Sequence, residues 1–302
     1  MLHHWPEPGV DCHAAASRRW WQAYTAPELR IVITHDRIVA FECSRRGRLG
    51  GAAQCLQHAA HAVDDHSDAH AASPSAPLWE TLRLVLSTYA GQRWHVVVVL
   101  SNQFVRWLAL PWQDQIRSRA DQQAYFAHGL QQAFGSQTQP SQLRSQCPGY
   151  GKPFLINAIA EDLLTQLHRE FDAAGLPIGQ LLPAWQLSAN QSLAWMRKQG
   201  SEAAGWIVCR ESTSLTLACL QHGAWQQIRT LPVDRHSPDS DWRHTLRQVL
   251  LREQALHPER AQLPVYLAQT ALAGLRPEDF SPFKVIVLPT TEPAGQPMWS
   301  LA

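Results

Sequence analysis

The segment from His95 to Phe134 restricts the fold more than any other part of the chain. It opens with the apolar run HVVVVL at 95–100, which is typical of a strand covered on both faces. A polar turn at Asn102 follows, and the run FVRWLAL at 104–110 predicts a second strand joined to the first by a tight turn. An amphipathic helix comes next, and its apolar stripe contains Ile116, Ala120, Ala127, Leu130 and Phe134. Two strands followed by a helix predict an α/β architecture.

The other apolar runs predict a hairpin-first pattern that occurs twice. LRIVI at 29–33 and IVAFEC at 38–43 flank a polar turn, so we expect a β-hairpin there. Three later runs predict a three-stranded meander at 206–209, 215–220 and 225–231. A meander followed by a helix and further strands is the ribonuclease H-like half of the actin-like fold. We therefore expect two such halves around a cleft, with residues 1–28 as an N-terminal extension, 29–150 as the first half, an inserted subdomain at about 102–147, and 151–302 as the second half.

Composition and charge argue against several classes of protein. Hydrophobic residues make up 45% of the 302 residues and charged residues 17%, which is typical of a globular chain. The formal net charge is +1 and the basic residues are dispersed, so we expect no nucleic-acid partner. The six cysteines show no CxxC spacing, and no leader peptide or apolar run of about 18 residues is evident. These features favour a cytoplasmic protein without a membrane span of its own.

Two stretches resemble the actin-like assembly proteins of type IV pili and type II secretion. One is VVVVLSNQFVRWLALPW with the helix after it, and the other is PFLINAIAEDLLTQLHREFDAAGLPIGQLLPAWQLSANQSLAW. The chain is similar there to the PilM-type protein and to the cytoplasmic part of the secretion L-protein. The resemblance implies an actin-like ATPase fold and a cytoplasmic scaffold recruited to the inner membrane. It also implies binding of the cytoplasmic tail of a single-span membrane protein, with self-association left open and membrane contact only through that partner.

The elements that bind nucleotide in this fold are altered in the chain. Active actin-like ATPases carry an Asp-x-Gly-Thr-type hairpin, in which glycine lets the backbone approach phosphate and the acid binds Mg²⁺ through water. Neither turn here has the acid–glycine pair. A residual nucleotide site would consist of Thr34, Asp36, Glu211, Ser212, Thr213 and Gly274. We expect no catalysis and no cofactor; the alternative is an ATPase or small-molecule kinase that uses ATP and Mg²⁺ in a divergent site.

The inserted hairpin and helix are the expected partner-binding surface, because the resembling family uses this region for its partners. Large apolar side chains flank the polar turn there, and an arginine is available to pair with an acidic partner. The expected contributors are Arg106, Trp107, Trp112, Phe126 and Leu130.

Two further segments resemble ligand sites but are expected to be connections. The first contains Cys55, His58, His61, Asp64, Asp65, His66, Asp68 and His70. It could present pairs of metal ligands on a helical face, but it lacks a zinc signature, so we expect a solvated connection and no metal site. The second, Gly149-Tyr150-Gly151-Lys152, lacks the spacing of a phosphate-binding loop, and Pro153 removes a backbone donor.

Overall fold

The computed structural model describes residues 27–44, 54–63, 74–135, 140–233, 240–267 and 277–288. The chain forms two compact units. The first consists of the chain up to Asp65 with Ser75–Val99 and Leu167–Leu182, and the second contains Leu100–Gln166 and the chain from Pro183. Each unit is described separately below.

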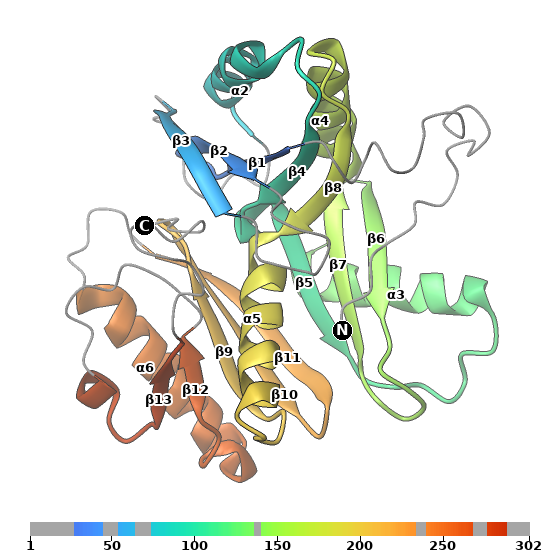
Figure 1. Cartoon of the computed structure of the whole chain (residues 1–302). Helices are drawn as coiled ribbons and strands as arrows, with labels where there is room; N and C mark the ends of the chain where they lie inside the picture. Colours follow the sequence, from blue (N-terminus) through green and yellow to red (C-terminus); the bar gives the residue numbers. More distant parts are fainter. Residues whose placement is uncertain are drawn as a thin grey trace. The chain divides into compact units, whose positions relative to one another are not determined.

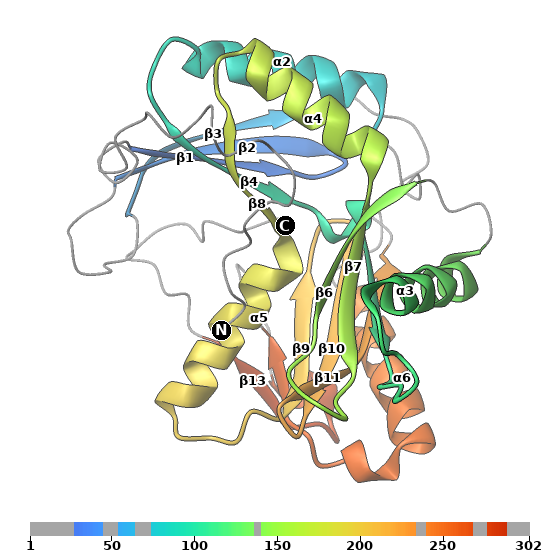
Figure 2. The same cartoon turned by 90° about the vertical axis from the view of Figure 1, so that its right-hand side faces the viewer.

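The first unit contains a five-stranded sheet in the order β3-β2-β1-β4-β8. Its strands are β1 (Glu28–Ile33), β2 (Arg37–Ser44), β3 (Gln54–Ala62), β4 (His95–Leu100) and β8 (Ile178–Pro183). β1 and β2 form the predicted hairpin, with Ile33 opposite Ile38. Helices α2 (Ala76–Tyr89) and α4 (Glu161–Ala173) lie across one face of this sheet (Figures 1 and 2). The Arg83 guanidinium of α2 donates two hydrogen bonds, of 2.8 and 2.7 Å, to the Glu170 carboxylate of α4.

The second unit contains a sheet in the order β11-β10-β9-β12-β13. Its strands are β9 (Gly205–Arg210), β10 (Ser214–Gln221), β11 (Ala224–Pro232), β12 (Val265–Leu267) and β13 (Val285–Val287). The first three form the predicted antiparallel meander, and β12 lies parallel to β9. Counted in chain order, both sheets have the strand order 3-2-1-4-5. The predicted duplication of one α/β half is therefore confirmed at the level of topology.

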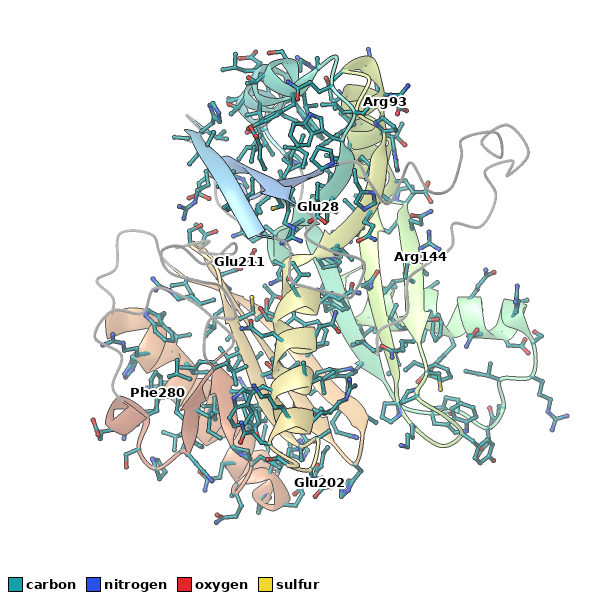
Figure 3. All side chains as sticks on the ribbon, in the orientation of Figure 1. Glu28, Arg93, Arg144, Glu202, Glu211 and Phe280 are labelled. Carbon is teal, nitrogen blue, oxygen red and sulfur yellow. The ribbon has the colours of Figure 1, made fainter. Side chains whose placement is uncertain are left out.

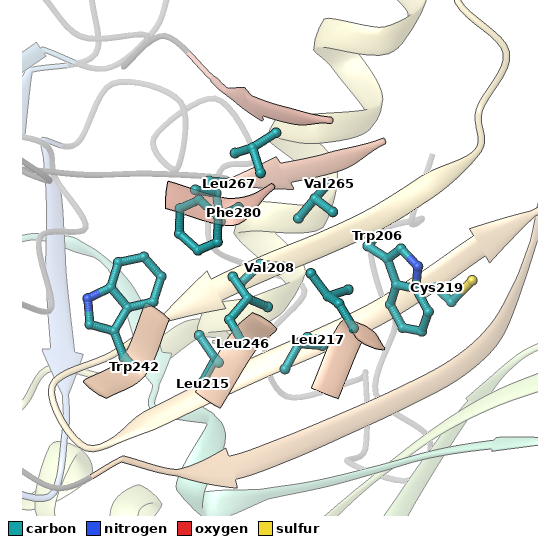
Figure 4. Packing of buried hydrophobic residues seen from close by; sticks show 12 residues of the cluster. Trp206, Val208, Leu215, Leu217, Cys219, Trp242, Leu246, Val265, Leu267 and Phe280 are labelled. Atoms are coloured by element: carbon teal, nitrogen blue, oxygen red, sulfur yellow. The ribbon is translucent and has the colours of Figure 1, made fainter. Parts of the chain in front are cut away.

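Helices cover both faces of the second sheet. Successive strand residues point to opposite faces. Accordingly Val265 and Leu267 pack with α6 (Ser240–Leu256), whereas Tyr266 meets Trp195 of α5 (Ala184–Lys198). The α6 face holds a core of Trp206, Val208, Leu215, Leu217, Cys219, Trp242, Leu246, Leu250, Val265, Leu267, Phe280 and Val285 (Figure 4). Short 3-10 helices at Pro258–Arg260 and Pro277–Phe280 precede the last two strands.

A three-stranded antiparallel sheet completes the second unit. Its order is β5-β7-β6, from strands Val105–Leu110, Phe154–Ala160 and Ser141–Gln146. A 3-10 turn at Asn102–Phe104 leads into β5, and helix α3 (Arg119–Phe134) packs on the sheet through Phe126. Gly129 of α3 permits this approach, because a Cβ there would lie 2.7 Å from Leu110 Cδ1.

Strand pairing differs from the sequence prediction in two places. β4 and β5 do not pair as a hairpin, because β4 joins the first five-stranded sheet and β5 pairs with β7. β8 also joins the first sheet, so the two units do not separate at the predicted boundary between 150 and 151. The physical reason is the same in both places: apolar periodicity identifies a strand but does not identify its hydrogen-bonding neighbour.

Candidate functional site

Glu211 occupies the turn between β9 and β10, where the sequence predicts one of the two altered nucleotide elements. Its backbone N–H donates to the Ser214 carbonyl over 2.8 Å and closes the turn. Its side chain is directed inward, and the residue is only 1% exposed. Figure 3 shows it at the end of β9, near the start of α5. This acid of the possible residual nucleotide site is therefore buried.

Asn102 connects the Glu211 carboxylate to the N-terminus of α5. The backbone N–H of Asn102 donates to both Glu211 oxygens, at 2.9 and 3.2 Å, and the Ser214 hydroxyl donates at 2.8 Å. The Asn102 side-chain oxygen accepts from the backbone N–H of Trp185 at 2.9 Å, which supplies the cap that Pro183 cannot. Its amide nitrogen lies 3.7 Å from Cys209 Sγ. The donors around Glu211 are thus supplied by the chain itself.

Burial is the main influence on the pKa values of Glu211 and Cys209. Burial raises the pKa of Glu211 to about 7, although hydrogen bonds from Ser214, Ser101 and Asn102 oppose the shift by favouring the carboxylate. Burial, with the Glu211 charge beside it, also raises the pKa of Cys209 to about 12, so this thiol stays protonated at neutral pH. A buried carboxyl that is enclosed by donors is a poor ligand for Mg²⁺, which prefers accessible oxygens and bound water.

The turn between β1 and β2 is also closed by its own side chains. The Thr34 hydroxyl lies 2.8 Å from Asp36 Oδ1 and 2.8 Å from the Arg37 carbonyl oxygen. The Arg37 backbone N–H donates to the same hydroxyl at 3.1 Å. Asp36 is therefore partly occupied within the turn, and no glycine allows a phosphate to approach the backbone there.

The other residues of the predicted nucleotide site add no phosphate-binding group. Thr213 is buried, and its carbonyl accepts from the Val233 backbone N–H at 2.9 Å. Ser212 is half-buried in the same turn. Gly274 lies outside the described residues. The described residues do not form the glycine-lined phosphate contact of an active actin-like site.

Three of the five predicted partner-binding side chains belong to the interior. Trp107, Phe126 and Leu130 are 6%, 4% and 5% exposed. Trp107 meets Trp185 edge-on at a centroid distance of 4.9 Å, and Trp185 meets Trp225 at 4.8 Å. The face of α3 that packs onto its sheet contains Phe126, Gly129 and Leu130, so it is not available to a partner. Of the predicted stripe only Leu130 belongs to this face, since Ala120, Ala127 and Phe134 are exposed. This part of the prediction is corrected.

The other two predicted residues remain near the surface. Arg106 is half-buried, with its guanidinium carbon 5.7 Å from the centroid of the Phe134 ring. Trp112 is half-buried and stacks on Phe154, with a centroid distance of 5.3 Å and an interplanar angle of 14°.

Trp112 belongs to a small surface group with Tyr150 and Asp114, which we call the aromatic–acidic cluster. The rings of Trp112 and Tyr150 lie 5.0 Å apart, and Tyr150 is 83% exposed. Asp114 Oδ1 accepts from Trp112 Nε1 at 2.7 Å and from the Tyr150 hydroxyl at 3.0 Å. The bond to Asp114 raises the pKa of Tyr150, so the phenol remains a donor. The sequence prediction missed Tyr150 and Asp114, since both lie in polar loops.

The first part of the histidine-rich segment is a strand, where the sequence predicted a solvated connection. β3 extends to Ala62, so His58 and His61 lie in a strand, opposite Phe41 and Ile38. Residues 64–70 are outside the described part of the chain. Within the described ranges, no group of three His, Cys, Asp or Glu side chains is arranged to hold a metal ion. No helix in those ranges is both long and apolar enough to cross a membrane.

Comparison with known proteins identifies the fold. No family model and no curated protein matches the sequence. Solved structures do match, among them a Bacteroides thetaiotaomicron protein with actin-like ATPase fold and unknown function. It is 10% identical, with a TM-score of 0.54 over 90% of this chain and 94% of that one.

Two further matches come from assembly systems. The PilM–PilN type IV pilus biogenesis complex is matched at 13% identity, with a TM-score of 0.56 over 87% and 88% of the two chains. The cytoplasmic domain of EpsL, an inner-membrane component of the type II secretion system of Vibrio cholerae, is matched at 14% identity, with a TM-score of 0.53 over 91% and 93%. At these identities the likeness establishes the fold alone. The chain has the actin-like ATPase fold predicted from its sequence.

Proposed function

We propose that this chain is a non-catalytic cytoplasmic scaffold of a pilus or secretion assembly platform at an inner membrane. In this role it binds the cytoplasmic tail of a membrane protein and contacts the membrane only through that partner. The similarity to the PilM–PilN complex and to the EpsL cytoplasmic domain supports the assembly role. The exposed aromatic–acidic cluster supports a binding role, because surface tryptophan and tyrosine are favoured anchors in protein interfaces.

The observation that carries the proposal is the state of Glu211. An active site of this fold needs an acid whose oxygens reach Mg²⁺ through water. Here the carboxyl accepts from the Asn102 backbone and the Ser214 hydroxyl, and is shielded from solvent. Opening it to a metal would leave several buried donors unsatisfied, at a cost of about 1–3 kcal/mol each. Without Glu211 as an accessible metal ligand, the fold is better suited to a structural platform than to nucleotide chemistry.

Calorimetric titration of the full chain with Mg-ATP tests this proposal. We expect no binding heat, no turnover and no thermal stabilisation. A bound nucleotide at about 100 times its dissociation constant would add about 2.7 kcal/mol to the free energy of unfolding. Micromolar binding that Asp36→Ala abolishes would instead support the alternative, an ATPase or small-molecule kinase with a divergent site.

A further inference from the structure

The aromatic–acidic cluster is ordered before any partner arrives. One face of the Trp112 ring stacks on Phe154, a buried residue in the core of the three-stranded sheet, and this contact fixes its position. Tyr150 is fixed at its ring by Trp112 and at its hydroxyl by Asp114. An exposed tyrosine held at both ends offers rigid contact area, so little conformational entropy is lost on binding.

The cluster carries the negative charge of Asp114, and only one of the two carboxylate oxygens accepts hydrogen bonds within it. Both hydrogen bonds to the Asp114 carboxylate fall on Oδ1, and no hydrogen bond to Oδ2 is found among the described residues. Lys152, two residues after Tyr150, is directed elsewhere and donates to the His222 carbonyl at 3.3 Å. The cluster therefore combines two aromatic rings with a carboxylate oxygen that can accept further donors.

We propose that Trp112, Tyr150 and Asp114 bind an arginine side chain of the partner's cytoplasmic tail. A guanidinium is planar, stacks on aromatic faces and donates to carboxylates, so it satisfies both properties of the cluster at once. The source of the arginine follows from membrane topology, because cytoplasmic segments next to a membrane span are enriched in Lys and Arg. This inference rests on the proposed function and reverses the predicted charge relation, in which Arg106 pairs with an acidic partner.

The test follows Tyr150 directly in the full chain. The protein contains five tyrosines, so incorporation of 3-fluorotyrosine gives a simple fluorine NMR spectrum in which Tyr150→Phe assigns the Tyr150 resonance. The probe is a short peptide of glycine, serine and leucine with one central arginine. The control peptide carries citrulline, which keeps the shape and removes the charge. We expect the arginine peptide to shift the Tyr150 resonance saturably and the citrulline peptide to leave it unmoved.

Variants separate the carboxylate from general charge effects. Asp114→Asn is expected to lower the affinity for the arginine peptide about fivefold. An exposed ion pair and an exposed cation–π contact are each worth a few-fold in affinity, and this variant removes the ion pair. Asp162→Asn, an exposed acid at the start of α4, makes the same charge change elsewhere and is expected to have no effect. Equal shifts with both peptides, or unchanged affinity in Asp114→Asn, would overturn the inference.

The outcome is distinguishable from a failure of the proposed function. If the chain still binds inner membranes through a protein partner while the Tyr150 resonance stays fixed, the arginine site is wrong and the scaffold stands. If the arginine peptide titrates Tyr150 but no membrane partner binds, the site stands and the scaffold is wrong.

Discussion

At the scale of single residues, the buried carboxyl of Glu211 makes stability depend on pH. Its pKa is about 7 in the folded chain, against an ordinary value of 4.5 that we take for the unfolded chain. Between these values the folded state holds more protons than the unfolded state. The contribution to stability is therefore fully present below about pH 4.5 and is lost as pH rises through about 7. At about 1.4 kcal/mol per pKa unit, the loss is on the order of 3 kcal/mol.

Glu211→Gln removes this titration, so its free energy of unfolding is expected to lose that part of the pH dependence. Urea unfolding of both proteins at about pH 5 and about pH 8 measures the difference, which cancels the titration of the other groups. The free energy of unfolding of the variant, relative to that of wild type, is expected to be higher at about pH 8 than at about pH 5. Glu202→Gln, an exposed site, is the control. An equal difference at both pH values would show that Glu211 does not carry a raised pKa.

The sequence identified the turn residues but not their environment. Asp36 and Glu211 each lie between two predicted strands, so both could be placed in hairpin turns. The burial of Glu211 depends on Asn102, which is 109 positions away in the chain. Asn102 itself could be assigned only to a turn, because its links to Glu211 and Trp185 require the tertiary fold.

At the scale of elements, α3 begins at a capping box that fixes its first turn. The Ser118 hydroxyl accepts from the Asp121 backbone N–H at 3.0 Å, and the Asp121 carboxylate accepts from the Ser118 backbone N–H at 3.0 Å. The hydrogen bond with the Ser118 side chain, more than those from the backbone N–H groups of Arg117 and Ser118, lowers the pKa of Asp121. The helix that starts at this cap packs on the three-stranded sheet through Phe126.

Ser118→Ala is expected to lower the free energy of unfolding by about 1 kcal/mol, the usual cost of losing an N-cap. Chemical denaturation monitored by circular dichroism measures the change. Ser87→Ala makes the same substitution on the exposed face of α2, where the hydroxyl only bonds the Leu84 carbonyl, and is expected to change stability by less than about 0.5 kcal/mol. A loss at Ser118 no larger than that at Ser87 would contradict the capping role.

Element types were more predictable than strand partners. The helices α2 to α5 and the meander follow apolar periodicities, which local sequence determines. β6 was missed because its sequence, SQLRSQ, has one apolar residue and its only described partner strand is β7. HAAHA at 58–62 lacks β-branched residues and was predicted to be part of a connection, although pairing with β2 keeps it extended as part of β3.

At the scale of the whole molecule, the duplication of one α/β half is what the sequence predicted best. Two hairpin-first patterns indicated two related halves, and both sheets have the order 3-2-1-4-5. The unit to which each strand belongs was less predictable, since β8 joins the first sheet from a distant part of the chain. Which large apolar side chains lie near the surface was least predictable, because residue type alone does not separate the buried Trp107 from the half-buried Trp112.

Binding to inner-membrane vesicles of the native host tests the central claim most directly. The purified full chain is mixed with vesicles whose cytoplasmic face is outward, with the same vesicles after trypsin treatment and inhibition, and with vesicles of the extracted lipids. A basic cytoplasmic tail is removed by trypsin, whereas the bilayer is not. The account predicts that the chain sediments with untreated vesicles only. Equal sedimentation with the trypsin-treated or pure lipid vesicles, or no sedimentation with any of them, would contradict it.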